Sequence, residues 1–120
     1  PRRWAVILLT VGVIESVANQ QHDFFIKPQA FHKLQLEQIA DEVSDPDDLV
    51  GLVSNANPNE FYFLNRKGWL IDPDDTSAAN LHGLFERGCK YVFMPRERYT
   101  SALTFNLIFE NEHYLVFALN

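Results

Sequence analysis

Six amide, basic and aromatic side chains between residues 55 and 69 are the best candidates in this chain for binding a ligand. Arg66 and Lys67 form a cation pair, and Trp69 follows two positions later. Cations beside an aromatic ring can bind a sugar or a lipid phosphate. The same pattern also fits a structural role in which the cations satisfy a helix end and the indole packs in the core. The other three candidates are Asn55, Asn57 and Tyr62.

A second group of candidates follows a predicted strand near residue 94. Arg96 and Arg98 are cations in a chain of net charge −6, so they mark a local positive spot suited to a phosphate or an acidic acceptor. If the strands are parallel, residues 54–58 and 94–98 meet at one sheet edge, where Asn55, Asn57 and the two arginines line one cleft. The alternative is that both arginines pair with carboxylates on helix surfaces.

Catalytic and metal-binding patterns are missing from the sequence. His22, His32, His82 and His113 are far apart, without the spacing of a metal site. No glycine-rich phosphate loop occurs. The sequence therefore predicts no catalytic residue, no metal and no cofactor. The single cysteine, Cys89, excludes an internal disulfide framework and is expected to be a small buried residue at a strand start.

The elements that position these residues can be read in chain order. Spacing of apolar residues predicts an amphipathic helix over residues 29–43, and the run 49–53 predicts a buried strand. A short helix should begin at Pro58, carry Arg66 and Lys67 in its last turn, and end at Gly68 in a left-handed conformation. We expect Trp69 to open the next strand.

The second half of the chain repeats this alternation. Thr76 or Ser77 should cap a helix that ends at Gly88, and residues 90–94 should form a strand. A final amphipathic helix is predicted from about residue 96 to 105, and a hairpin from residues 107–109 and 113–119. The predicted fold class is α/β: a small two-layer or three-layer sandwich with a mostly parallel sheet of four to five strands, a terminal β-hairpin and an N-terminal apolar segment.

Length and composition indicate one globular domain. The chain has 120 residues, of which 47% are hydrophobic and 13% aromatic. Its acidic balance argues against a nucleic-acid partner, which requires concentrated lysine and arginine.

The first 20 residues stand apart from the domain predicted for residues 21–120. Arg2 and Arg3 precede an apolar run from Trp4 to Ile14, and Glu15 closes it. Eleven residues are fewer than the roughly 20 that span a bilayer. The run could be the end of a transmembrane helix, a buried helix or strand, or the core of a signal peptide. The residues alone favour a buried segment, and charge order fits a cytoplasmic start and an outside end.

Short stretches from residue 30 to the end resemble the C-terminal extracytoplasmic region of bacterial integral-membrane glycosyltransferases. These are the lipid-carrier-dependent enzymes related to the protein mannosyltransferases and aminoarabinose transferases. The matching positions are Asn57, Pro58, Tyr62, Arg66, Lys67, Gly68 and Trp69, then Leu81, Leu84, Gly88, Lys90, Tyr91 and Val92, and finally Phe109, Glu110, Asn111, Tyr114, Leu115, Val116 and Phe117.

The resemblance implies an accessory soluble domain on the extracytoplasmic (periplasmic) side of a cell membrane. Such enzymes transfer a sugar from a polyprenyl-phosphate carrier, and their catalytic acid lies in a first loop that has no counterpart here. The implied partners are the transmembrane region of the same polypeptide, the membrane surface and a lipid-linked sugar donor or acceptor. The resemblance also shifts the interpretation of residues 1–20 toward the end of a transmembrane helix. The alternative function is a free-standing α/β module that binds a small ligand.

Overall fold

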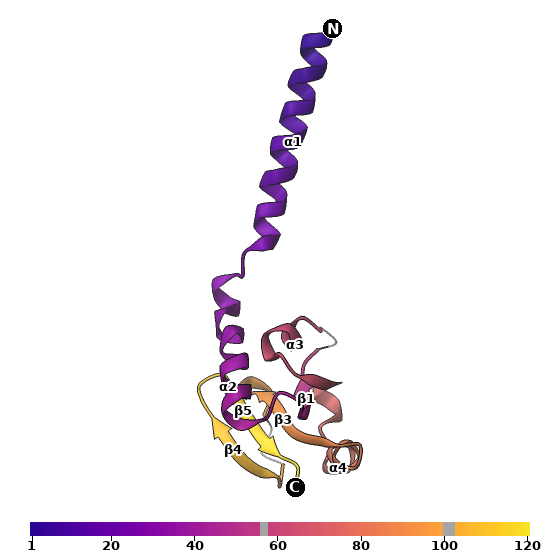
Figure 1. The fold of residues 1–120 in the computed structure, drawn as a ribbon, viewed down its shortest axis with the longest axis vertical. Helices are drawn as coiled ribbons and strands as arrows, with labels where there is room; N and C mark the ends of the chain where they lie inside the picture. The colour runs from indigo at the N-terminus through magenta and orange to yellow at the C-terminus, as the bar shows by residue number, and fades with distance from the viewer. Residues whose placement is uncertain (56–57, 100–102) are drawn as a thin grey trace. The chain divides into compact units, whose positions relative to one another are not determined.

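The computed structural model describes residues 1–55, 58–99 and 103–120, and its contacts divide the chain into two units (Figure 1). The first unit covers residues 1–31 and the second covers residues 32–120. Asn57, one of the candidate site residues, lies outside the described residues.

The first unit is built on the helix α1 (Arg2–Phe24). Its large apolar side chains, from Trp4 to Val17, are exposed. In the described part of the chain, no helix combines the length and the apolar character needed to cross a bilayer. A 3₁₀-helix, η1 (Pro28–Leu34), follows α1.

The second unit is organised around a five-stranded mixed sheet with the strand order β2-β1-β3-β5-β4. β1 pairs in parallel with β2 and β3, while β5 pairs antiparallel with β3 and β4. The α/β class is confirmed, but the prediction of a mostly parallel sheet is wrong. The predicted hairpin explains this, because it inserts β5 beside β3 in the opposite direction. The strands are β1 (Leu49–Val53), β2 (Lys67–Ile71), β3 (Cys89–Pro95), β4 (Asn106–Glu110) and β5 (Tyr114–Ala118).

Helices cover both faces of the sheet and make three layers (Figure 1). On one face, α2 (Gln35–Val43) and α3 (Asn59–Leu64) bury Leu36, Ile39 and Leu64 against Val50 and Phe93. On the other face, α4 (Ala78–Glu86) packs its buried leucines against the strand side chains that point to that face. Side chains alternate across a strand, so one sheet supplies both cores. The second core contains Leu81, Leu84, Val92, Met94, Leu115 and Phe117.

The helix α4 has the predicted ends. The Ser77 hydroxyl accepts a hydrogen bond from the backbone N–H of Asn80, and Gly88 lies beyond the last turn with φ +98°. Phe85, the residue after the buried Leu84, is 40% exposed.

The helix α3 ends earlier than the sequence predicts. Asn65, not Gly68, takes the left-handed conformation at its end, with φ 49°. Asparagine tolerates this region better than most residues, so it stops the helix before Arg66. Arg66 therefore lies beyond the helix and Lys67 opens β2. Gly68 has a positive φ, +156°, but it lies inside β2 and not at a helix end.

The helix predicted for residues 96–105 is also wrong over the described residues. Only a single turn, η3 (Arg96–Arg98), is present, and Tyr99 is already extended. The Arg96 backbone N–H donates to the His113 carbonyl oxygen at 2.8 Å, which ties this segment to the hairpin instead of to a helix. Residues 103 and 104 have no regular structure, and residues 100–102 lie outside the description.

An ion pair joins the residue before β1 to the beginning of β3. The Lys90 ammonium donates to Asp48, whose carboxylate also accepts from the Asp45 backbone N–H. Asp48 is buried, with 7% of its surface exposed. The hydrogen bond from Lys90 is the largest cause that holds the pKa of Asp48 below its ordinary value.

The D48N variant should be less stable than the wild type at neutral pH and should lose less stability in acid. A lowered folded-state pKa stabilises the fold above the ordinary pKa of aspartate, and this contribution disappears as pH falls below about 4. Melting temperatures measured from pH 7 to pH 2 test this. The exposed neighbour provides the control, D47N, which should keep the wild-type profile. Parallel acid profiles for D48N and the wild type would contradict the assignment.

Candidate functional site

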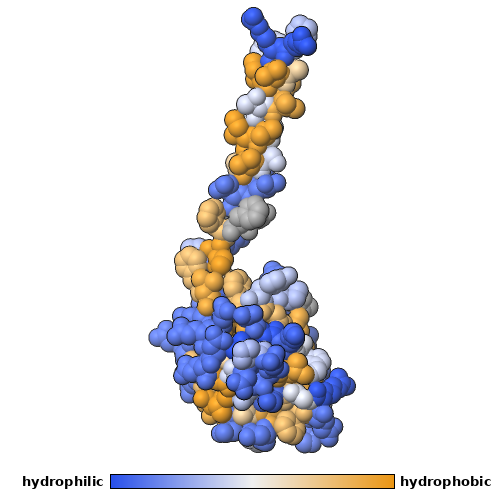
Figure 2. All heavy atoms as spheres, viewed as in Figure 1, coloured by the Kyte–Doolittle hydropathy of each residue, from blue (hydrophilic) through white to orange (hydrophobic). Residues whose placement is uncertain are grey.

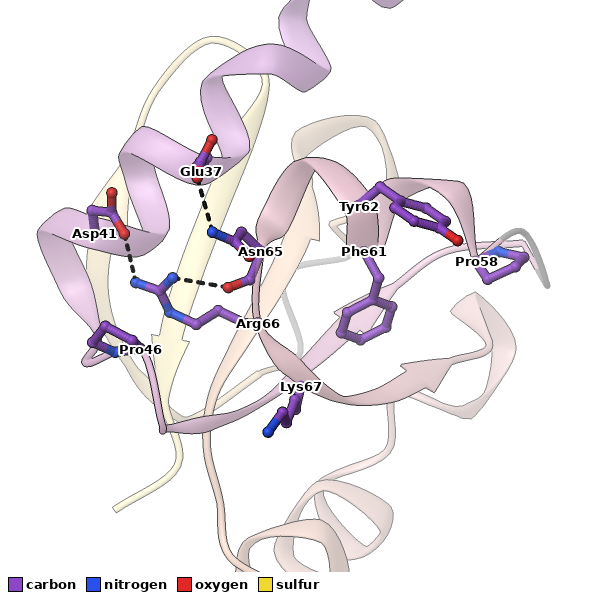
Figure 3. A pocket seen from close by; sticks show the side chains of 9 residues that line it. All are labelled: Glu37, Asp41, Pro46, Pro58, Phe61, Tyr62, Asn65, Arg66 and Lys67. Carbon is purple, nitrogen blue, oxygen red and sulfur yellow. Dashed lines mark hydrogen bonds and ion pairs between the residues drawn. The ribbon is translucent and has the colours of Figure 1, made fainter.

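A cavity of about 570 Å³ lies between α2, α3 and the start of β2, and we call it the α3–β2 pocket (Figure 3). It contains three of the six candidates from residues 55–69, which are Tyr62, Arg66 and Lys67. Its lining residues are Glu37, Asp41, Pro46, Pro58, Phe61, Tyr62, Asn65, Arg66 and Lys67.

Arg66 forms the fixed wall of this pocket. Its side chain is only 1% exposed, and Nη2 lies 2.8 Å from Asp41 Oδ1 (Figure 3). The guanidinium also donates to the carbonyl oxygens of Ser44 and Asn65 and to the Ser44 hydroxyl. Arg66 therefore joins the end of α2 to the start of β2. These contacts occupy N–H groups of the guanidinium that a ligand would otherwise bind. They correspond to the structural alternative, in which this arginine binds a helix end.

A second cross-link supports the same wall. The Asn65 side-chain amide donates to Glu37 Oε1 at 2.9 Å (Figure 3). Asn65 also ends α3, so one residue sets both the helix end and the contact with α2.

Tyr62 and Lys67 differ from Arg66 because the described contacts give them no structural task. Tyr62 is 84% exposed, and Lys67 is exposed at the beginning of β2. Neither side chain makes a hydrogen bond or ion pair with the residues that the structure describes. The phenol and the ammonium are therefore the groups of this pocket that are available to a ligand, above an apolar wall that includes Phe61 and Pro58.

Trp69 does not belong to this pocket. It is partly buried and packs against the core on the α4 face of the sheet. The cation pair and the indole predicted as one trio thus occupy separate environments.

A smaller cavity of about 210 Å³ lies where β1 and β3 end, and we call it the strand-end pocket. Asn55 and Arg98 both line it, so the structure brings together two of the four side chains expected at this edge. Its lining residues are Lys33, Val53, Ser54, Asn55, Glu60, Pro95, Glu97 and Arg98.

Arg96, the third described member of that expected cleft, lies elsewhere. It forms an ion pair with Glu110 on β4, and its Nε donates to the Asn111 carbonyl oxygen at 2.8 Å. The alternative prediction was that this arginine pairs with a carboxylate on a helix surface. The structure shows a carboxylate partner, but it lies on a strand. Arg96 lines a third cavity, of about 340 Å³, beside His32 and His113.

Two residues of the strand-end pocket were not found from the sequence. Lys33 Nζ lies 2.7 Å from Glu60 Oε1, although the residues are far apart in the chain. Lys33 lay on the polar face of a predicted helix and Glu60 in the first turn of another. No spacing pattern in the sequence links these two residues, because only the packing of the folded chain brings Lys33 beside Glu60.

Cys89 and the metal-ligating types of side chain are the further candidates within the described residues. Burial raises the pKa of the Cys89 thiol to about 11, so it stays protonated at neutral pH and is a poor nucleophile. Across residues 1–55, 58–99 and 103–120, no three His, Cys, Asp or Glu side chains converge on a point where a metal ion could bind.

Comparisons with protein-family models, with curated proteins and with solved structures found no match for this chain. The resemblance to membrane glycosyltransferases therefore stays a prediction.

Proposed function

We propose that this chain is a membrane-attached accessory domain of a glycosyltransferase that uses a polyprenyl-phosphate sugar donor. In this proposal residues 32–120 lie on the extracytoplasmic side and bind a ligand, while the chemistry takes place elsewhere in the enzyme. The sequence resemblance suggests the enzyme class. The observation that carries membrane attachment is the surface of α1.

The large apolar side chains of α1 are exposed all around the helix. Their exposed fractions range from 51% to 73%, and Figure 2 shows hydrophobic residues gathered along α1 beyond its hydrophilic first residues. Consecutive positions of a helix point in different directions, so these side chains cover more than one face. One flat protein surface would cover a stripe, whereas hydrocarbon can surround the helix. The exposed residues are Trp4, Val6, Ile7, Leu8, Leu9, Val11, Val13, Ile14 and Val17.

The charges at the two ends of this apolar run support one orientation. Arg2 and Arg3 precede it and Glu15 follows it. Basic residues favour the cytoplasmic side of a bilayer, and this charge order agrees with the extracytoplasmic position that the resemblance implies for the second unit.

Flotation with phospholipid vesicles tests the attachment. The full chain should float with the vesicles. The double variant I7D/V11D should reduce the floating fraction at least tenfold, because each buried aspartate costs on the order of 3 kcal/mol in hydrocarbon. The control L107D adds a charge at a 42% exposed leucine of β4 and should float like the wild type. Equal flotation of I7D/V11D and the wild type would refute attachment through α1.

The purified chain should not transfer sugar from a polyprenyl-phosphate donor. The reason is that the resemblance places the catalytic acid of such enzymes in a first loop with no counterpart here, and that no metal-binding cluster is found among the described residues. A radiolabelled donor and a range of acceptors, followed by chromatography, provide the measurement. Product above the level of a heat-denatured sample would contradict an accessory role.

A free-standing small-ligand module is the second candidate. The polar strand-end pocket favours it, because such a pocket can bind a ligand without a membrane. A full chain that binds a small ligand but fails to float would support this candidate over the first.

A further inference from the structure

The carboxylate of Glu60 has one oxygen with a partner and one without. Oε1 pairs with Lys33 at 2.7 Å, and 13% of the side chain is exposed. Oε2 is buried and accepts no hydrogen bond within the described part of the chain. A buried acceptor without a donor costs about 1–3 kcal/mol, and more when it is charged. Among the described residues, this oxygen therefore has an unused capacity to accept a hydrogen bond.

Arg98 provides a group of the opposite sign in the same pocket. Its closest carboxylate among the described residues is Glu97, at 3.8 Å from Nε to Oε1, which is too long for a hydrogen bond. The side chain is 38% exposed. Its guanidinium can therefore offer a planar pair of donors to a ligand carboxylate.

The position of the pocket in the sheet is also one where ligands bind. β1 is parallel to both β2 and β3, and the chain passes from β1 to β2 on one side before returning to β3 on the other. α3 and α4 cover opposite faces. The strand order thus reverses between β1 and β3, and open α/β sheets bind ligands at the carboxyl ends of strands at such a reversal.

The charges of the pocket indicate the class of ligand. Two cations, Lys33 and Arg98, and two carboxylates, Glu60 and Glu97, line it, so their formal charges cancel. A multiply charged anion or a bare cation gains little from such a pocket, whereas a molecule with separated opposite charges complements it. The volume of about 210 Å³ is below the usual range for drug-sized ligands, about 300–1,000 Å³.

We propose that the strand-end pocket binds a small zwitterion of amino-acid size, with its ammonium group at the Glu60 carboxylate and its carboxylate on Arg98. Asn55 and Ser54, at the end of β1, supply further polar contacts. This proposal stands on the pocket alone and does not require the glycosyltransferase assignment.

Amide chemical shifts of the full chain in a mild detergent test the proposal. Titration with glycine and β-alanine should shift the amides of residues 54–55, 60 and 97–98 in a saturable way. Glycerol, as an uncharged probe, and inorganic phosphate, as a simple anion, should bind at least tenfold more weakly. Tighter binding of glycerol or phosphate than of either zwitterion, or saturable shifts at other residues only, would overturn the proposal.

Matched variants identify the two binding groups. E60Q and R98Q should each weaken zwitterion binding at least tenfold, while R87Q, at an exposed arginine after α4, should not. E60Q should also keep the wild-type melting temperature within a few degrees, because Oε2 has no partner to lose among the described residues and the Lys33 pair is partly exposed. Arg98 lies on an exposed turn, so R98Q remains folded. Unchanged binding by R98Q would refute the proposal.

Discussion

G68V should destabilise the second unit by at least about 4 kcal/mol, or prevent it from folding, which places it among the most damaging single substitutions. A Cβ atom built at Gly68 would lie 1.6 Å from the Val50 carbonyl oxygen and 2.8 Å from the Val50 nitrogen. These are backbone atoms of the neighbouring strand, with which Gly68 is in register. They cannot move without breaking the β1–β2 pairing. The positive φ of +156° adds strain for any other residue.

Urea denaturation followed by circular dichroism measures this loss. The control G83A changes a glycine within α4, where a Cβ would meet no atom within 4 Å. Because alanine favours helix over glycine by about 1 kcal/mol, G83A should be as stable as the wild type or slightly more stable. A G68V protein with the midpoint of the wild type would show that β1 and β2 do not approach as described.

R66M should cost about 3 kcal/mol and should act through the fold. The buried guanidinium holds the carbonyl oxygens of Ser44 and Asn65 and the Asp41 carboxylate. Removal takes this donor from the half-buried Ser44 and breaks the links to Asp41 and Asn65, which are exposed. R66K should recover less than half of the loss, because an ammonium cannot reproduce the planar fork of donors.

The neighbouring residue supplies the matched control for this prediction. K67M removes an exposed cation one position away, and its unfolding free energy should stay within about 0.5 kcal/mol of the wild type. If R66M proved as stable as K67M, the contacts of Arg66 would not contribute to stability. It would then become a candidate for ligand binding again.

Local patterns predicted most elements of the second unit. The run at Leu49 predicted β1, Ser77 predicted the start of α4, and the polar turn near Asn111 predicted the hairpin of β4 and β5. In each case the residues of one short segment are enough to predict the element. Helix α2 was predicted from apolar spacing, although its first part is a 3₁₀-helix.

Errors arose where a distant contact decides the local structure. The sequence around Gly68 permits a helix end there, but Asn65 ends α3 earlier and donates to Glu37 on α2. The segment after Pro95 has helical spacing, yet its first amide is bound by the hairpin at His113. The residues within each segment do not indicate these distant partners, Glu37 and His113.

The candidate site was also predicted only in part, because some of its pairings are contacts between distant residues. Sheet topology was enough to place Asn55 and Arg98 at one edge, because parallel strands end on the same side. Sheet topology does not predict the ion pair between Arg96 and Glu110 or the one between Lys33 and Glu60. Such pairings depend on side-chain distances in the finished fold.

The location of β5 has a consequence for how the domain forms during synthesis. Tyr114 to Ala118 are all buried, and this strand lies between β3 and β4 although it is made last of the five. While β5 remains inside the ribosomal tunnel, β4 has no partner and one edge of β3 stays open. Domains fold as units during translation and expose apolar surface until they are complete. Both cores therefore depend on β5, and a nascent chain that ends before residue 114 exposes the apolar residues that this strand covers.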